Sequence, residues 1–140
     1  MVKKKNFVVC AVFLSALVFM RCGHEEVQNY KDLEQNMMDL KLYQENLGDQ
    51  IKRKNLDEAS WLLEGADSIL LVVSKKFKEH RNLQRPFSYY YKKEMREPIH
   101  EMRQAIKKND TAKALNGYRI LVKNCNSCHI DNDVDKEVRF

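Results

Sequence analysis

The sequence predicts an all-α protein, an antiparallel bundle of four helices. Chain breakers are scarce, with four glycines and two prolines in 140 residues. Apolar residues recur at spacings of three and four in four successive segments, which is the period of an amphipathic helix. None of these segments alternates apolar and polar residues as a half-buried strand does. Four such segments joined by short connections are typical of an up-down-up-down bundle, whose facing helices share one core.

The first 22 residues are expected to be an export signal that precedes this bundle. A run of three lysines, Lys3 to Lys5, is followed by fourteen apolar or small residues from Phe7 to Met20. A positive start before a short apolar stretch is typical of a signal peptide, and the stretch is shorter than the roughly 20 residues of a membrane span. We therefore divide the chain into a signal peptide at 1–22 and one helical domain at 23–140.

Cys22 is a candidate site of lipid attachment. A cysteine followed by glycine directly after an apolar stretch is where a bacterial lipoprotein is cleaved and lipidated. The residues just before it, Met20 and Arg21, depart from the small residues of that pattern. Cleavage nearby and an uncleaved anchor therefore remain as alternatives to a membrane tether through Cys22.

The first two helices of the bundle are expected between residue 27 and about His80. The first covers residues 27–51, and its apolar stripe, which Gln44 interrupts, consists of Leu33, Met37, Leu40, Leu47 and Ile51. The second begins at Asn55 and Glu58, whose spacing resembles a capping pair. It carries a broad apolar face and is expected to end near His80.

The third and fourth helices follow a connection at residues 82–86. The third continues the helical period from Tyr91 to Ile106, and Pro98 must kink or restart it because proline lacks a backbone donor and crowds the preceding turn. The fourth begins after Asp110 or Thr111, either of which is a suitable N-cap. Its stripe consists of Leu115, Tyr118, Val122, Cys125 and His129.

The fourth helix ends with a motif that is typical of one cofactor, Cys125-Asn126-Ser127-Cys128-His129. Cys-x-x-Cys-His is the run by which haem is attached covalently in c-type cytochromes. Side chains three apart share a helix face, so the thiols of Cys125 and Cys128 can add to the two vinyl groups at one edge of a porphyrin. His129, one turn after Cys125, can then bind the iron as its proximal ligand. The sequence therefore predicts one covalently bound haem c near the C-terminal end of the fourth helix.

A zinc site, a redox pair and a disulfide each fit the cysteine pair less well than haem attachment does. A structural zinc site needs four nitrogen or sulfur ligands, but the remaining cysteines, Cys10 and Cys22, lie in or at the end of the export signal. A thioredoxin-like redox pair needs a strand-helix-strand setting, whereas the residues before Cys125 have helical periodicity. A disulfide accounts for both thiols and leaves His129 unexplained.

The charge of the chain argues against nucleic acid as a partner. The chain carries 25 basic and 20 acidic residues, a formal net charge of +5. Four of the basic residues, Lys3 to Lys5 and Arg21, belong to the export signal. The rest of the chain therefore has 21 basic and 20 acidic residues. A nucleic-acid-binding domain usually has a marked basic excess. We expect no nucleic-acid partner.

With its attachment motif at the end of the last of four helices, residues 23–140 resemble the class II c-type cytochromes, which are cytochrome c′ and its low-spin relatives. The common small soluble cytochromes c have the motif near the N-terminus instead. The resemblance implies His129 as an axial ligand and the first helix over the opposite face of the haem. Members with a methionine there are six-coordinate electron carriers, and members with a non-ligand bind small gases at open iron. Cytochromes c′ often pair through their first helices, so a homodimer is also implied.

Met37 is the candidate for the distal ligand. In an antiparallel arrangement the distal residue should come from roughly Tyr30 to Met38, and Met37 lies on the core stripe. Methionine at helical spacing also serves as ordinary core filler. Met37 lies about 15 Å along the predicted helix at 1.5 Å per residue, deeper than expected for a partner of His129, and Leu33 fits that depth better. A non-ligand at this position, and His24 as a ligand, therefore remain alternatives.

The sequence as a whole predicts an exported electron carrier whose iron cycles between Fe(II) and Fe(III). A gas-binding protein for nitric oxide or carbon monoxide with an open sixth position is the alternative, and a scaffold or sensor with a structural haem is a third. No paired carboxylates, nucleophile with its base, or phosphate loop lies beside the motif, so we expect no enzyme and leave peroxidase-like side activity open. Redox partners would bind transiently through a small interface. Because haem attachment takes place outside the cytoplasmic membrane, we expect the periplasm or the outer face of a membrane.

Overall fold

Helices make up all the regular secondary structure that the computed structural model describes, in residues 33–78, 83–135 and 137–139. These residues belong to one compact unit, Lys31–Phe140. No strand occurs among them, and four long helical segments pack together. The all-α class and the four packed helices are thereby confirmed. The predicted signal peptide at 1–22 lies outside the described residues.

Helix α1 (Leu33–Lys52) buries a face that differs by part of a turn from the predicted stripe. Leu40, Leu47 and Ile51 are buried as expected, whereas Leu33 and Met37 are only partly buried against the core. Their place on the buried face is taken by two polar residues, Asn36 and Gln44. The predicted start of this helix near Val27 lies outside the described residues.

Helix α2 (Leu56–Lys76) begins directly after Asn55, as predicted, but it lacks the predicted side-chain cap and ends earlier than predicted. The Asn55 side chain does not cap the helix; its amide nitrogen donates instead to Gln50 Oε1 at 2.9 Å, so the expected capping pair with Glu58 is wrong. The helix ends at Lys76 because Phe77 leaves the helical conformation, with φ −102° and ψ 65°. That end comes earlier than the predicted end near His80, which itself lies outside the described residues.

The third helical segment is continuous but changes its hydrogen-bonding pattern. It consists of α3 (Phe87–Tyr90), the π-helical turn η1 (Tyr91–Met95) and α4 (Arg96–Lys107). The backbone N–H of Arg96 bonds the carbonyl of Tyr91, five residues earlier. Pro98 then falls in the first turn of α4, where the missing N–H of proline is tolerated. The predicted restart at Pro98 therefore takes the form of a π-helical turn directly before it.

Helix α5 (Thr111–Asp131) starts as the sequence predicts. The Asp110 side chain accepts a hydrogen bond of 3.0 Å from the backbone N–H of Lys113, which is the bond of an N-cap. The preceding turn has Asn109 at φ 55°, a left-handed conformation that asparagine tolerates well. The cap therefore fixes where the helix that carries the motif begins.

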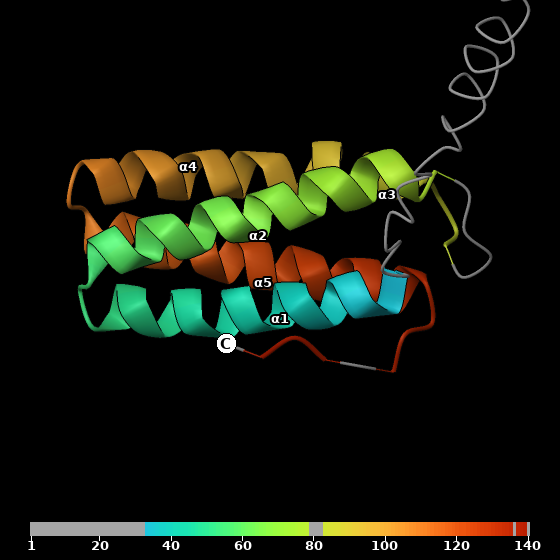
Figure 1. Ribbon diagram of the computed structural model, residues 1–140, viewed down its shortest axis with the longest axis horizontal. Coiled ribbons are helices and arrows are strands. Elements are labelled where there is room, and N and C mark those ends of the chain that lie inside the picture. The colour runs from blue at the N-terminus through green and yellow to red at the C-terminus, as the bar shows by residue number, and fades with distance from the viewer. Residues whose placement is uncertain (1–32, 79–82, 136, 140) are drawn as a thin grey trace, which may run out of the picture. The chain divides into compact units, whose positions relative to one another are not determined.

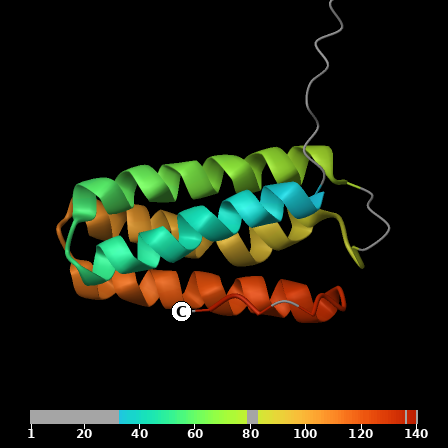
Figure 2. The same cartoon turned by 60° about the horizontal axis from the view of Figure 1, so that its bottom comes forward.

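The four helical segments enclose a single apolar core (Figure 1). The most extensive contacts join α1 to α2 and α4 to α5, whereas α1 and α5 share a smaller contact. Figures 1 and 2 show the α1–α2 turn and the α4–α5 turn at one end of these segments, and the end of α2 and the start of α3 at the other.

Two glycines allow helices to approach closely. A Cβ atom at Gly48 would lie 2.5 Å from Cζ of the buried Tyr118, and one at Gly117 would lie 2.6 Å from Cγ of Met102. The first contact joins α1 to α5, and the second joins α5 to α4. The glycines therefore mark the positions at which α5 meets its two neighbours.

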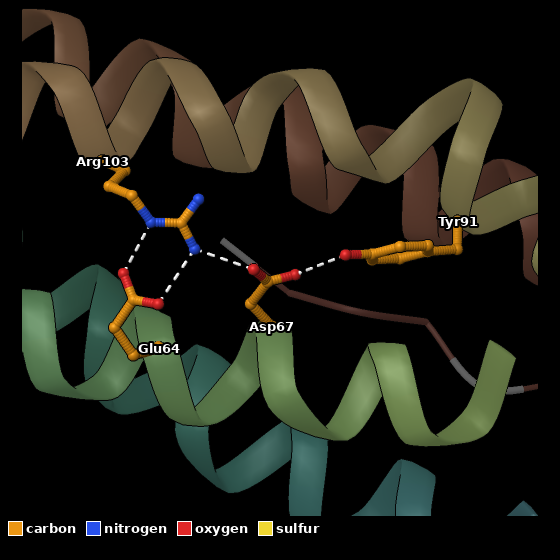
Figure 3. A network of polar contacts seen from close by, with 4 residues as sticks. All are labelled: Glu64, Asp67, Tyr91 and Arg103. Atoms are coloured by element: carbon orange, nitrogen blue, oxygen red, sulfur yellow. Dashed lines mark hydrogen bonds and ion pairs between the residues drawn. The ribbon is translucent and has the colours of Figure 1, made fainter. Parts of the chain in front are cut away.

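A polar network joins α2 to the third helical segment (Figure 3). The Arg103 guanidinium donates to both carboxylate oxygens of Glu64, at 2.6 and 3.0 Å, and to Asp67 Oδ2 at 2.7 Å. The Tyr91 hydroxyl donates to the other oxygen of Asp67 at 2.8 Å. Burial, followed by this bond to Asp67, raises the pKa of Tyr91 to about 12.

Within the described part of the chain, no helix is both long enough and apolar enough to cross a membrane.

Candidate functional site

The last two turns of α5 bring the predicted attachment residues together. Cys125 and Cys128 lie three residues apart and are 8% and 6% exposed, so both face the core. Both are free cysteines. His129, the next residue, is partly buried. Cys128, which the predicted apolar stripe did not include, is therefore more deeply buried than His129, which the stripe did include.

Burial keeps both thiols in their neutral form. Removal from water is the largest cause that raises the pKa of Cys125 and of Cys128, each to about 12. The nearby carboxylate of Glu94 adds to the rise at both sulfur atoms, and a side-chain hydrogen bond from Asn132 opposes it at Cys128. Because the thiolate is the reactive form, the thiols of this closed structure are poor nucleophiles at neutral pH.

Asn124, directly before the motif, binds the third helical segment. Its side-chain amide donates to the backbone carbonyl of Glu94. In a regular helix that carbonyl would accept from the N–H of residue 98, but Pro98 has none. Asn124 therefore occupies an acceptor that Pro98 leaves vacant, and in doing so fixes the motif against η1.

Asn126, inside the motif, holds the C-terminal residues. Its amide nitrogen donates to the carbonyl of Val138 at 2.9 Å, and its oxygen accepts from the N–H of Val138 at 2.7 Å. The chain after α5 accordingly turns back along that helix (Figure 2). An open groove of about 860 Å³ lies beside this contact, and its lining includes Val122, Ile130 and the basic residues Arg119 and Lys123. The groove lining does not include the thiols or His129.

Asn132 ends α5 one turn after Cys128 and is 7% exposed. Its oxygen accepts from the backbone N–H of Gln84 at 2.6 Å, and its nitrogen donates to the carbonyl of Cys128 at 2.6 Å. The same nitrogen lies 3.6 Å from Cys128 Sγ. Asn132 thus joins the end of the motif to the connection before α3.

The sequence pattern did not reveal the contacts of these three asparagines, which anchor α5 and the residues after it to other segments. Each uses a side-chain amide to bind backbone groups, and the partners of Asn124 and Asn126 lie 30 and 12 residues away. The one signal in the sequence is Pro98, which leaves the carbonyl of Glu94 without its helical donor.

The residues present fit a covalently bound haem by their chemistry. Two thiols and an imidazole are the donor set that the cofactor requires, and they occupy two turns of one helix. Two buried polar atoms, Gln44 Nε2 and the Tyr90 hydroxyl oxygen, make no hydrogen bond of ordinary geometry in the described part of the chain, although each lies near a polar side chain, that of Tyr118 and that of Asn132 respectively. An incomplete polar interior of this kind is consistent with a core that receives a further group. Because both thiols are buried, neighbouring helices have to move apart for a porphyrin to reach them.

Of the remaining candidate residues, Met37, Cys22 and His24, the structure describes only Met37. Met37 lies on α1, partly buried and packed against the core. Cys22 and His24 lie outside the described residues. Across residues 33–78, 83–135 and 137–139, no group of three or more histidine, cysteine, aspartate or glutamate side chains is arranged to hold a metal ion.

Comparisons of the chain with protein-family models, with curated proteins and with solved structures give no match.

Proposed function

We propose that the chain is a c-type haem protein that is exported and carries electrons, with one haem c attached to α5 inside an antiparallel four-helix bundle. The observation that carries the proposal is the motif at the end of α5, where Cys125 and Cys128 face the core and His129 follows directly. The antiparallel arrangement is supported by the helix ends, since both short turns lie at one end of the bundle and the end of α2 and the start of α3 lie at the other (Figure 1).

Each motif residue has one task in this proposal. Cys125 and Cys128 hold the porphyrin through thioether bonds, and the imidazole of His129 binds the iron. The haem supplies the one-electron change between Fe(II) and Fe(III). The burial of the two sulfur atoms excludes water, which is one of the means by which a protein sets the potential of such a centre.

Met37 is the proposed distal ligand of the electron carrier. The contact between Gly48 and Tyr118 provides a common reference along α1 and α5. Met37 precedes Gly48 by eleven residues, and His129 follows Tyr118 by eleven residues. At 1.5 Å per residue in two antiparallel helices, both lie about 16 Å from that contact, which supports Met37 despite its depth in the helix.

A gas-binding protein with an open sixth position is the second candidate. The observation that favours it is that Leu33, an apolar residue one turn before Met37, also packs against the core from α1. An aliphatic side chain there would cover the distal face without binding the iron. Neither candidate requires a catalytic acid or base, so we do not propose an enzyme.

The proposed location and partners of the carrier are inferred from its N-terminal residues and from its charge. Residues 1–22 would direct export to the periplasm or the outer face of a membrane, and lipid on Cys22 would tether the protein there. Its partners would be redox proteins that meet it transiently, and nucleic acid would not be among them. A homodimer through α1 is part of the same proposal.

The proposal is tested by spectra of the chain after expression with a haem-maturation system. Ferric and ferrous forms are recorded with and without carbon monoxide. A low-spin ferrous form that does not bind carbon monoxide is the result expected of the carrier, and Met37→Ala should convert it into a high-spin form that binds the gas. A high-spin wild type that binds carbon monoxide readily would favour the second candidate. A chain without covalently bound haem would refute both.

A further inference from the structure

Asn132 contacts Cys128 at two atoms. The side-chain nitrogen donates to the carbonyl oxygen of Cys128 at 2.6 Å and lies 3.6 Å from the sulfur atom, within reach of a hydrogen bond to sulfur. An asparagine amide has two N–H donors, so one can serve the oxygen and the other the sulfur. The backbone N–H of Asn132 bonds the carbonyl of His129 at 3.2 Å. Asn132 is therefore fixed to the motif by both its backbone and its side chain.

A bond from a second segment fixes the orientation of the Asn132 side-chain amide. Its oxygen accepts the backbone N–H of Gln84, in the connection before α3, at 2.6 Å. With the oxygen held there, the amide nitrogen faces Cys128 and also lies near the Tyr90 hydroxyl. The side chain is 7% exposed, so water competes little for these bonds. The sulfur of Cys128 is thus held between the apolar core and an oriented donor.

We propose that Asn132 is a positioning residue for Cys128, which holds the sulfur atom for formation of the second thioether bond. The inference rests on the proposed function. In that step the S–H bond of Cys128 adds across the C=C bond of a porphyrin vinyl group. Sulfur bonds to the vinyl carbon next to the ring, the hydrogen goes to the terminal carbon, and the π bond is consumed, so no oxidant or reductant is required. Asn132 exchanges no atom; it restricts rotation of the Cys128 side chain.

Asn124 provides a matched control on the same helix. It also flanks the motif and also binds a backbone carbonyl through its side-chain amide, that of Glu94, but it donates to η1 instead of Cys128. Asn124→Ala therefore removes a comparable bond between segments. Asn132→Asp is a second variant at the proposed position, because a carboxylate can still accept the N–H of Gln84 but has no N–H to offer the sulfur.

The first experiment counts thioether bonds after maturation with haem, by mass spectrometry of the haem peptide. Asn132→Ala and Asn132→Asp should increase several-fold the share of chains whose haem is bound through Cys125 alone. Asn124→Ala should keep the wild-type share even if its total yield falls, because loss of general stability lowers attachment at both cysteines. An unchanged share of doubly attached haem in both Asn132 variants would overturn the proposal.

The second experiment uses the folded, haem-free chain and measures alkylation of each cysteine by iodoacetamide. Loss of the Asn132 bond also raises the pKa of Cys128, so each labelling rate is divided by the thiolate fraction found from its pH dependence. The corrected ratio of the rate at Cys128 to that at Cys125 should rise several-fold in Asn132→Ala and stay at the wild-type value in Asn124→Ala. Global unfolding exposes both thiols and would not shift the ratio in this direction. An unchanged ratio in Asn132→Ala would contradict the positioning role. This readout needs no haem, so it remains decisive if the proposed function fails for lack of covalent haem in the wild type.

Discussion

Cys125 and Cys128 link the chemistry of the motif to the stability of the haem-free chain. Burial raises the pKa of both thiols to about 12, from an ordinary value near 9. A folded pKa above the unfolded one means that the folded state holds its protons more tightly. The stability that this contributes is complete below pH 9 and is lost as the pH rises toward 12.

We therefore predict that the haem-free chain loses stability between pH 9 and pH 11 more steeply than its Cys125→Ala/Cys128→Ala variant. The tyrosines of the core titrate in the same range but are present in both proteins, so the difference between the two curves isolates the thiols. Urea unfolding of both proteins across this pH range provides the measurement. Parallel curves would show that the thiols are not held in their neutral form by the fold.

Arg103 holds together the largest polar network that the structure describes between α2 and α4 (Figure 3). Its two partners differ in exposure, since the side chain of Glu64 is 55% exposed and that of Asp67 is 21% exposed. Exposed ion pairs contribute little because water and salt screen them. Asp67 also accepts a hydrogen bond from Tyr91. The bond to Asp67 should therefore stabilise more than the two bonds to Glu64.

For this network we predict that Arg103→Met lowers the free energy of unfolding by about 1 kcal/mol. Double-mutant cycles of Arg103→Met with Asp67→Asn and with Glu64→Gln separate the two contributions. The coupling energy with Asp67 should be the larger and should fall less on addition of salt. A larger coupling with Glu64 would contradict the ranking by exposure.

The contact between α1 and α5 is the helix interface on which the proposed haem site depends. Gly48 makes that contact possible, because a Cβ there would meet the ring of Tyr118, which is 2% exposed and has little room to move. Gly65 on α2 is similarly close to the ring of Tyr43, but that ring is only partly buried and can shift outward.

Gly48→Ala should accordingly destabilise the haem-free chain by about 1–3 kcal/mol, the usual cost of overpacking. Gly65→Ala should cost less, because the gain in helix propensity of up to about 1 kcal/mol is offset only by movement of a surface ring. Thermal or urea unfolding of the two variants compares them directly. Equal losses would mean that the α1–α5 contact is looser than the structure describes.

The π-helical turn η1 and α5 are coupled through Pro98 and Asn124. We predict that Asn124→Ala costs about 1–2 kcal/mol in the wild-type chain, because it leaves the carbonyl of Glu94 without a donor. In the Pro98→Ala background the cost should be smaller, since a backbone N–H at position 98 can then bond that carbonyl. Unfolding of the single and double variants gives the interaction energy. Strictly additive losses would contradict the proposed exchange of donors.

Across the molecule, features that depend on local periodicity can be predicted from the sequence. Contacts between residues that are distant in the sequence cannot. Four helices, the Asp110 cap and the position of the motif follow from spacing and residue type. The burial of Gln44 does not, because a polar residue on a stripe is indistinguishable from an interruption until its partner helix is known. Asn55 has the residue type of a cap, yet its amide reaches Gln50 instead.

The surroundings of the motif could not be predicted for the same reason. The partners of Asn124 and Asn132 lie in η1 and before α3, 30 and 48 residues away. A pattern along one helix specifies which face is apolar, but it does not specify which backbone group of another segment comes within reach. The motif itself could be recognised because its chemistry requires two cysteines and a histidine within about a turn and a half of helix.

The central claim is that α5 holds a haem through two sulfur atoms, and denaturation of the matured protein tests it most directly. The wild type, unfolded in acid and separated from free porphyrin, should retain one haem per chain, and Cys125→Ala/Cys128→Ala should retain none under the same conditions. A wild-type chain that loses its pigment on unfolding, or a double variant that keeps it, would contradict the account.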